Sequence, residues 1–156
     1  MTKTVRTTTL SILIAMMLLA VTVTTAFAAP PLSLHMEVDE VIGTSGETFF
    51  ASGPAVSAGV VCPTGTVDDL SVVASSPGGA ITILHVHKRF YCADSSGSFD
   101  VRMVVRLDNN THATTARWIL SGGSGDYAHL RGLGRLVGTP IVPGTSIHDV
   151  YDGRVH

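Results

Sequence analysis

One short segment gathers several side chains that could take part in chemistry. Residues 85–91 read His-Val-His-Lys-Arg-Phe-Tyr. Alternate side chains of an extended strand share a face, so one face would carry His85, His87, Arg89 and Tyr91. A few convergent polar groups in an apolar cavity are typical of a small-molecule site. These four residues are therefore ligand-binding candidates.

The pairing of this strand with the next one decides whether that face points inward. If Cys92 pairs with Ser98, the polar set joins Met103 on the inner wall, and Met103 becomes a fifth candidate. A bulge in the loop would turn the alternate, apolar set inward and leave the histidines in water, because a slip by one residue exchanges the two faces. The need to bury apolar side chains favours this second arrangement. The apolar set consists of Leu84, Val86 and Phe90.

Motifs for catalysis or for cofactor binding are missing from the sequence. It contains no nucleophile elbow, no Walker loop and no zinc-protease helix. Two histidines at i and i+2 are fewer than the three or four protein ligands that zinc normally takes. We therefore expect no metal and no cofactor, and the sequence identifies no catalytic residue.

Apolar and polar residues alternate with period two along most of the chain, which predicts strands. The clearest run is Phe99 to Asp108, and the last is Ile147 to His156, where Asp149 shares a face with Ile147 and Tyr151. Clusters of turn-forming residues separate the runs, and no stretch shows a capped helical pattern. The sequence thus predicts an all-β domain of about eight antiparallel strands.

A glycine-rich segment, residues 121–138, indicates how the sheet closes. Gly132, Gly134 and Gly138 fall on one face of a strand, and a strand without side chains on one face can bend sharply. A sheet with such a corner favours a closed barrel over a sandwich. The expected corner comprises Gly122, Gly123, Gly125, Gly132 and Gly134.

The run GGSGDYAHLRG at residues 122–132 resembles a motif of the allene oxide cyclase and dirigent-like barrels. The closing residues 149–156 resemble the last strand of small exported bacterial relatives. The resemblance covers the C-terminal third and implies a calycin-like, eight-stranded antiparallel barrel with an apolar cavity and a tendency to self-associate. Some members cyclise or couple small apolar compounds without a cofactor. The carboxylate and polar cavity residues of the plant enzymes cannot be matched one by one to positions here, because the resemblance does not extend to the N-terminal two thirds. It therefore applies to the fold and not to activity.

The N-terminus has the layout of a secretory signal peptide. Lys3 and Arg6 precede an apolar run from Leu10 to Val23, and small residues precede a cleavage point after Ala28. The run is shorter than the roughly 20 apolar residues that span a bilayer. We therefore expect residues 1–28 to be removed and residues 29–156 to form one secreted domain without a membrane segment.

Cysteine content and charge agree with export. Cys62 and Cys92 are the only cysteines, and an even pair in an exported chain predicts a disulfide. Closing a loop of about 30 residues would stabilise the fold by roughly 3 kcal/mol.

The chain has 10 basic and 12 acidic residues and no basic cluster, so no nucleic-acid partner is expected.

The sequence therefore predicts a small secreted β-barrel, without an assigned activity, that holds a small apolar ligand. Two alternatives stay open. One is a cofactor-free isomerase or cyclase of the allene oxide cyclase type, in which His87, Arg89 and Tyr91 position the substrate. The other is a homo-oligomeric extracellular structural module.

Overall fold

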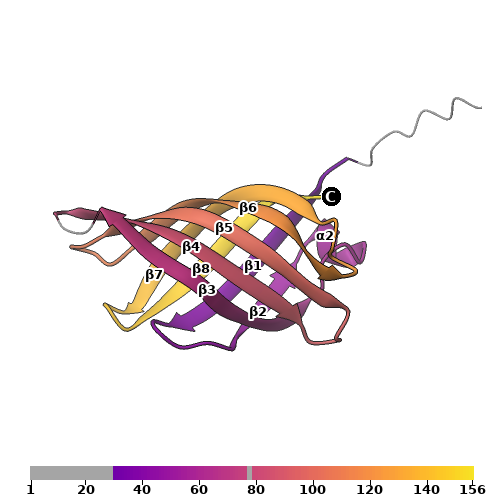
Figure 1. Ribbon diagram of the computed structural model, residues 1–156, viewed down its shortest axis with the longest axis horizontal. Helices are drawn as coiled ribbons and strands as arrows, with labels where there is room; N and C mark the ends of the chain where they lie inside the picture. The colour runs from indigo at the N-terminus through magenta and orange to yellow at the C-terminus, as the bar shows by residue number, and fades with distance from the viewer. Residues whose placement is uncertain (1–29, 77–78) are drawn as a thin grey trace, which may run out of the picture.

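The computed structural model describes residues 30–76 and 79–156. Eight antiparallel strands follow one another in chain order around a closed barrel (Figure 1). They are β1 (Leu32–Val41), β2 (Glu47–Ser52), β3 (Thr64–Ser76), β4 (Ile81–Cys92), β5 (Gly97–Asp108), β6 (Thr114–Gly125), β7 (Arg131–Val142) and β8 (Ser146–Val155). The short helix α2 (Pro54–Ser57) lies between β2 and β3. The predicted all-β closed barrel is confirmed.

The barrel closes where β8 pairs with β1. This pairing runs without interruption from Leu32 opposite Val155 to Val41 opposite Ser146. The β1–β2, β3–β4 and β7–β8 loops lie at one end of the barrel, and α2 lies at the other end (Figure 1). The expected signal peptide, residues 1–28, falls outside the described residues. Across residues 30–76 and 79–156, no helix is long and apolar enough to cross a membrane.

The predicted disulfide is confirmed at the end that carries α2. Cys62 and Cys92 are bonded, with their Cα atoms 5.9 Å apart, so the segment after α2 is fixed to the end of β4. Ala55 of α2 and Val61 are buried beside it, with exposed fractions of 0% and 1%. Helix α2 was not predicted, because four residues are too few to show a helical apolar pattern.

The glycines of β7 share one face of the strand, and this face points into the barrel. A Cβ atom at Gly134 would lie 2.4 Å from the Trp118 ring and 2.1 Å from the backbone oxygen of Asp152. Trp118 is 1% exposed, and its Nε1–H donates to the backbone oxygen of Arg135 at 2.9 Å. The indole ring therefore fills the space that the missing side chains leave on the inner wall.

Three glycines of the expected corner precede β7. Gly122, Gly123 and Gly125 form the end of β6, and the turn between β6 and β7 occupies residues 126–129. A Cβ atom at Gly123 would lie 1.9 Å from the backbone oxygen of Ser98 on β5. The backbone of β5 thus lies so close to Gly123 that a larger residue would not fit there.

The register of β4 with β5 settles which face of β4 points inward. Tyr91, not Cys92, pairs with Ser98, and Phe90 pairs with Phe99. The connecting loop is one residue shorter than the pairing of Cys92 with Ser98 requires, and the Asp94 carboxylate accepts a hydrogen bond from the Ser96 backbone N–H inside it. The apolar face of β4 is therefore the inner one, as the second arrangement predicts.

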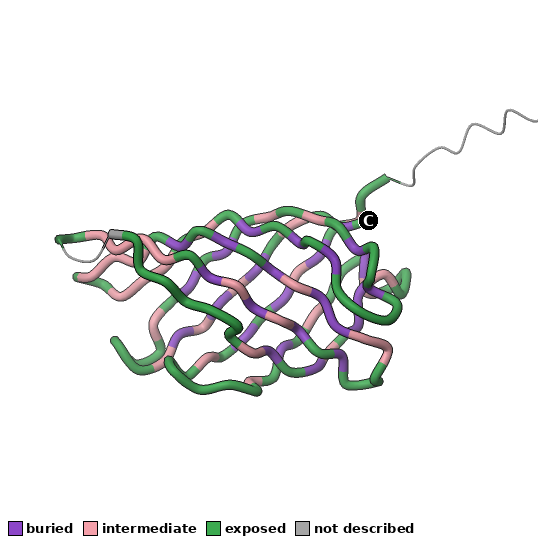
Figure 2. Tube along the Cα trace, in the orientation of Figure 1, coloured by how far each residue is buried: buried purple, intermediate pink, exposed green. Residues whose placement is uncertain are grey.

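Aromatic rings fill the half of the barrel near α2. Phe90 and Phe99 stack with their ring centres 5.1 Å apart, and Phe49 packs edge-on against Phe90 at 5.2 Å. Tyr127 contacts Phe99, and Tyr151 contacts Phe90. Buried and exposed positions alternate along the strands around this core (Figure 2). The packed half thus forms a rigid base for the other half.

Candidate ligand-binding cavity

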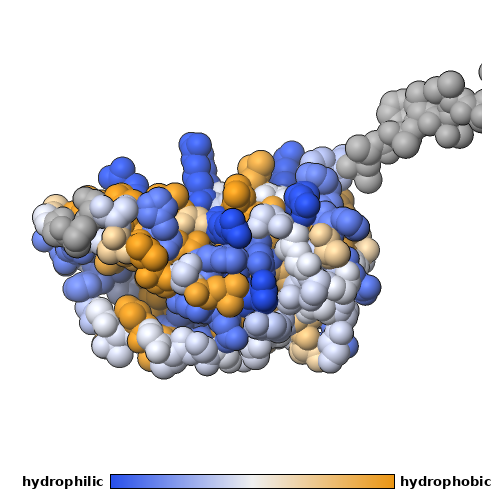
Figure 3. All heavy atoms as spheres, in the orientation of Figure 1, coloured by the Kyte–Doolittle hydropathy of each residue, from blue (hydrophilic) through white to orange (hydrophobic). Residues whose placement is uncertain are grey.

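The half of the barrel away from α2 is hollow. It encloses a cavity of about 600 Å³ that is bordered at its mouth by residues 42–45 of the β1–β2 loop, His112 and Gly144. Hydrophobic side chains gather at this end, beside a hollow in the surface (Figure 3). The apolar lining consists of Val67, Val72, Leu84, Val86, Met103, Val105, Leu107, Leu136 and Ile147. The volume of the cavity lies within the range of pockets that hold small organic molecules.

Side-chain size explains why this half is not filled. The inner positions of β4 and β5 carry Phe90 and Phe99 in the packed half but Val86 and Val105 in the hollow half. On β7 the corresponding inner position is Gly138. Small side chains at facing positions of a barrel leave its interior open.

A buried ion-pair cluster lies on the wall of this cavity. The Lys88 ammonium donates to Glu40 Oε2 at 2.7 Å and to Asp69 Oδ1 at 2.6 Å. The Lys88 side chain is 7% exposed, the Glu40 side chain 13% and the Asp69 side chain 33%. Three strands, β1, β3 and β4, therefore meet at one cation, and all three residues line the cavity.

Burial and charge act against each other within this cluster. Burial lowers the pKa of Lys88, but the charges of Glu40 and Asp69 together outweigh it, so the pKa is raised. Burial raises the pKa of the Glu40 carboxyl above its ordinary value, against the opposing effect of Lys88. Lys88 is therefore a fixed cation, already engaged by two carboxylates.

Asp149 is a second carboxyl on the cavity wall. It is 6% exposed, and burial, followed by the negative charge of Glu40, raises its pKa to about 7. Within the described residues, neither Asp149 Oδ1 nor the hydroxyl of Thr114 has a hydrogen-bond partner. A Cβ atom at Gly138 would lie 2.2 Å from Asp149 Oδ1 and 2.1 Å from Thr114 Oγ1. The two polar groups thus converge over the bare backbone of Gly138.

Tyr151 marks the boundary between the packed half and the cavity. Its side chain is fully buried against Phe90, and its hydroxyl has no hydrogen-bond partner among the described residues. Burial raises its pKa well above the ordinary value, and the charges of Glu40 and Asp149 raise it further. The phenol is therefore a neutral group beside the polar cluster.

The structure separates the five ligand candidates of the sequence. Met103 lines the cavity and is 5% exposed. His85, His87, Arg89 and Tyr91 lie on the outer wall and do not line it. Their outward position follows from the register that pairs Phe90 with Phe99. These four side chains therefore cannot position a substrate inside the barrel, as the isomerase alternative required.

Two of these outward residues contact a carboxylate on β5. Arg89 donates to both oxygens of Asp100, at 2.7 and 2.9 Å, and His87 Nε2 lies 3.1 Å from Asp100 Oδ2. Hydrogen bonds from Arg89, then from His87, hold the pKa of Asp100 below its ordinary value. This arrangement is a cross-strand charge pair on the barrel surface, of the kind that supports strand pairing.

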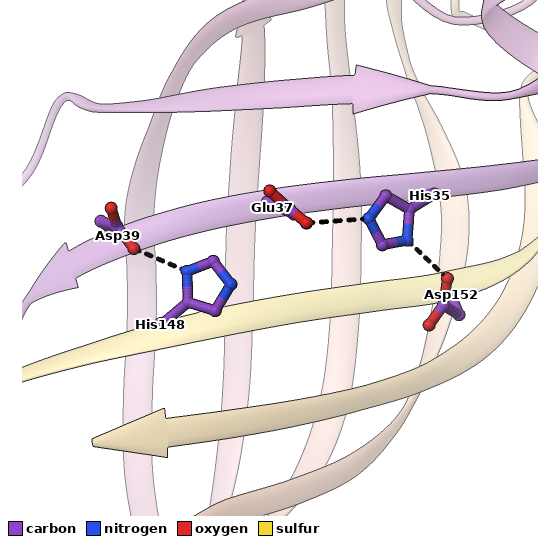
Figure 4. Close-up of polar contacts among 5 residues, drawn as sticks. All are labelled: His35, Glu37, Asp39, His148 and Asp152. Carbon is purple, nitrogen blue, oxygen red and sulfur yellow. Dashed lines mark hydrogen bonds and ion pairs between the residues drawn. The ribbon is translucent and has the colours of Figure 1, made fainter. Parts of the chain in front are cut away.

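A second outer cluster joins β1 to β8 (Figure 4). His35 lies 2.7 Å from Asp152 and 3.0 Å from Glu37, and His148 lies 2.7 Å from Asp39. The bonds to Asp152 and then to Glu37 raise the pKa of His35. In the portions of the chain described, no three His, Cys, Asp or Glu side chains are grouped to hold a metal ion. These contacts therefore connect the closing strands.

Five charged residues of the cavity were not predicted as site residues: Glu40, Glu47, Asp69, Lys88 and Asp149. The sequence held a signal for Glu40, Lys88 and Asp149, because each lies on the same face of its strand as apolar neighbours. Lys88 lies between Val86 and Phe90, which were expected inside. A charged residue on the buried side of a strand is rare unless it is paired or functional.

No family model, curated protein or solved structure matches this chain. The chemistry of the cavity is therefore inferred from its own residues.

Proposed function

We propose that this protein is exported and binds a small apolar molecule in the hollow half of its barrel. The observation that supports this proposal is the cavity of about 600 Å³, whose walls are mostly apolar and carry one polar cluster, that of Lys88, Glu40 and Asp69. The disulfide supports export, because such bonds persist in oxidising compartments. The rigid aromatic half supports binding without a large change of shape, since the cavity is already formed.

The unpartnered polar atoms give the second reason. Asp149 Oδ1, Glu40 Oε1 and Thr114 Oγ1 are buried without a hydrogen-bond partner in the described chain. A buried polar group without a partner destabilises a fold by about 1–3 kcal/mol, so each of these atoms is a place where a ligand group gains a hydrogen bond. An apolar molecule with one polar end suits this arrangement.

The experiment is titration of the mature protein with N-phenyl-1-naphthylamine, a neutral probe that fluoresces in apolar surroundings. We expect saturable binding that a Val105→Trp substitution abolishes, because Val105 lines the cavity and the indole ring would fill it. Val104→Trp is the matched control, since Val104 points outward and is 49% exposed. Equal binding by the two variants, with both shown to be folded by their melting curves, would place the probe outside the cavity and refute the proposal.

A second candidate is a cofactor-free isomerase of the allene oxide cyclase type. The pKa of Asp149 near 7 supports it, because such a carboxyl suits a general acid at neutral pH. The test supplies an unstable apolar epoxide and measures the stereochemistry of its cyclised product by chiral chromatography. An enzyme would give one enantiomer in excess, and Asp149→Asn would return the product to a racemate. A racemic product from the unaltered protein would eliminate this candidate.

A further inference from the structure

The charges that line the cavity are unbalanced. Four carboxyl groups face it, from Glu40, Glu47, Asp69 and Asp149. Against them stand one ammonium, that of Lys88, and the imidazole of His112 at the mouth. The surplus of acidic groups remains even while Asp149 holds its proton. An interior with more acids than bases attracts a cation, because buried like charges repel and an opposite charge stabilises them.

The single lysine cannot satisfy these acids. Its ammonium is already bound to Glu40 Oε2 and Asp69 Oδ1. The second oxygen of Glu40, one oxygen of Asp149 and the hydroxyl of Thr114 are left without a partner in the structure's described part. Asp149 is more than nine-tenths buried and lines the cavity. An ionised carboxylate only accepts hydrogen bonds, so once Asp149 has lost its proton the acceptors at this part of the wall outnumber the donors.

We propose that the ligand is an apolar primary amine, with its ammonium group bound between Glu40 and Asp149 and its hydrocarbon or aromatic body against the apolar walls. This assignment rests on the proposed function and names its ligand class. An ammonium has three donors and no acceptor, which matches the unpartnered oxygens. A carboxylate of equal size would meet like charge, and an alcohol would offer one donor without charge.

The protonation state of Asp149 links this binding to pH. The titratable groups around it are Glu40, Glu47, Asp69, Lys88, His112, His148 and Tyr151. Burial and Glu40 raise the pKa of Asp149 to about 7, so the carboxyl is neutral in mild acid and charged in mild base. An ammonium gains more from the charged form. Its affinity therefore rises with pH, provided that the amine itself stays protonated, as an alkylamine does in this range.

The experiment compares three probes of equal chain length by isothermal titration calorimetry: octylamine, octan-1-ol and octanoate. We expect octylamine to bind at least about tenfold more tightly than octanol, and octanoate to bind weakest, because one charge-assisted hydrogen bond contributes that much. Octylamine affinity should increase about tenfold from about pH 5.5 to about pH 8, as Asp149 loses its proton. Octanoate should show no such increase.

Asp149→Asn isolates the cause. In this variant octylamine should bind equally at both pH values, at the affinity that the unaltered protein has in mild acid. Asp126→Asn is the matched control, since Asp126 is exposed in the β6–β7 turn, and it should keep the full pH dependence. Octanoate binding as tightly as octylamine would overturn the amine assignment while leaving the cavity as an apolar binding site. Failure of all three probes and of the naphthylamine probe would overturn the proposed function as well.

Discussion

Replacing Asp149 by asparagine should change how the stability of the barrel depends on pH. The carboxyl is 6% exposed and lacks a partner for Oδ1 among the described residues, so the fold favours its neutral form. Asparagine has nearly the same shape and is neutral at every pH. The substitution therefore removes the charge without creating a cavity.

The direction follows from the two protonation equilibria. In the unfolded chain the carboxyl has its ordinary pKa of 3.8, and in the folded protein burial, followed by the charge of Glu40, raises it to about 7. Well below the lower value Asp149 is protonated in both states and its ionisation adds nothing. Between the two values the unfolded chain ionises first, which favours unfolding. The ionisation of Asp149 therefore lowers the stability of the wild-type protein as the pH rises from about 4 to about 7, and this contribution is complete above that range.

The size follows from the shift of about three pKa units, at about 1.4 kcal/mol for each unit, which gives roughly 4 kcal/mol over the whole range. Between about pH 5 and about pH 8 the expected share is roughly 3 kcal/mol. Urea denaturation at these two pH values gives the free energy of unfolding of each protein. The expected share is the change, between the two pH values, in the difference between Asp149→Asn and wild type. The variant should gain relative stability at the higher pH, and Asp126→Asn should follow wild type. Parallel pH profiles for Asp149→Asn and wild type would refute the reasoning.

Three further substitutions test the packed half, the glycine face and the ion pair. Cys62→Ser should destabilise the fold by about 3 kcal/mol, because the bond to Cys92 closes a long loop, and free-thiol titration of the unfolded, unreduced wild type should find no thiol. Gly134→Ala should destabilise it by about 1–3 kcal/mol, since its methyl group would overlap Trp118, and the melting temperature measures this. Lys88→Met should destabilise it by about 3–5 kcal/mol near neutral pH by leaving the buried Glu40 carboxylate, and the more exposed Asp69, without a cation, as urea denaturation would show.

The glycine and lysine substitutions each have a comparison on the outer wall. Leu133→Ala, next to the glycine face but 67% exposed, should change stability by no more than about 0.5 kcal/mol. Arg117→Met, which removes an exposed cation from β6, should likewise have little effect. A Gly134→Ala protein that melts with wild type would contradict the close packing on Trp118. An unchanged Lys88→Met protein would indicate that water, not the lysine, compensates the acids.

The closed barrel was predictable because its causes are local. Period-two alternation gives the inner and outer faces of each strand, as in β5, where Phe99 and Met103 are buried and Arg102 is exposed. The glycine row of β7 gives the curvature. The disulfide was predicted from the even number of cysteines together with the expected signal peptide. None of these inferences requires knowing which strands lie opposite each other across the barrel.

The site was not predictable in the same way, because it depends on distance across the barrel interior. Alternation places Lys88 and Asp149 on buried faces, but Glu40 and Asp69 come from two other strands. Whether these four residues meet is decided by strand register and by the stagger of the closed sheet. The register itself depended on the length of one loop before Ser98, and the polar face of β4 competed as an alternative. Local pattern therefore identified the fold and missed the cluster.

The glycine row connects the fold to the site. At Gly134 the missing Cβ makes room for the indole of Trp118, and the inner wall is filled with an apolar ring. Four residues further along the same face, Gly138 makes the same room, but there the Asp149 carboxyl and the Thr114 hydroxyl occupy it. The glycines that let the strand curve thus also allow two polar groups to approach the backbone of the wall, because no side chain lies between them. A Gly138→Ala protein should accordingly keep its barrel and lose the amine preference, because a methyl group at that position would push Asp149 from its place.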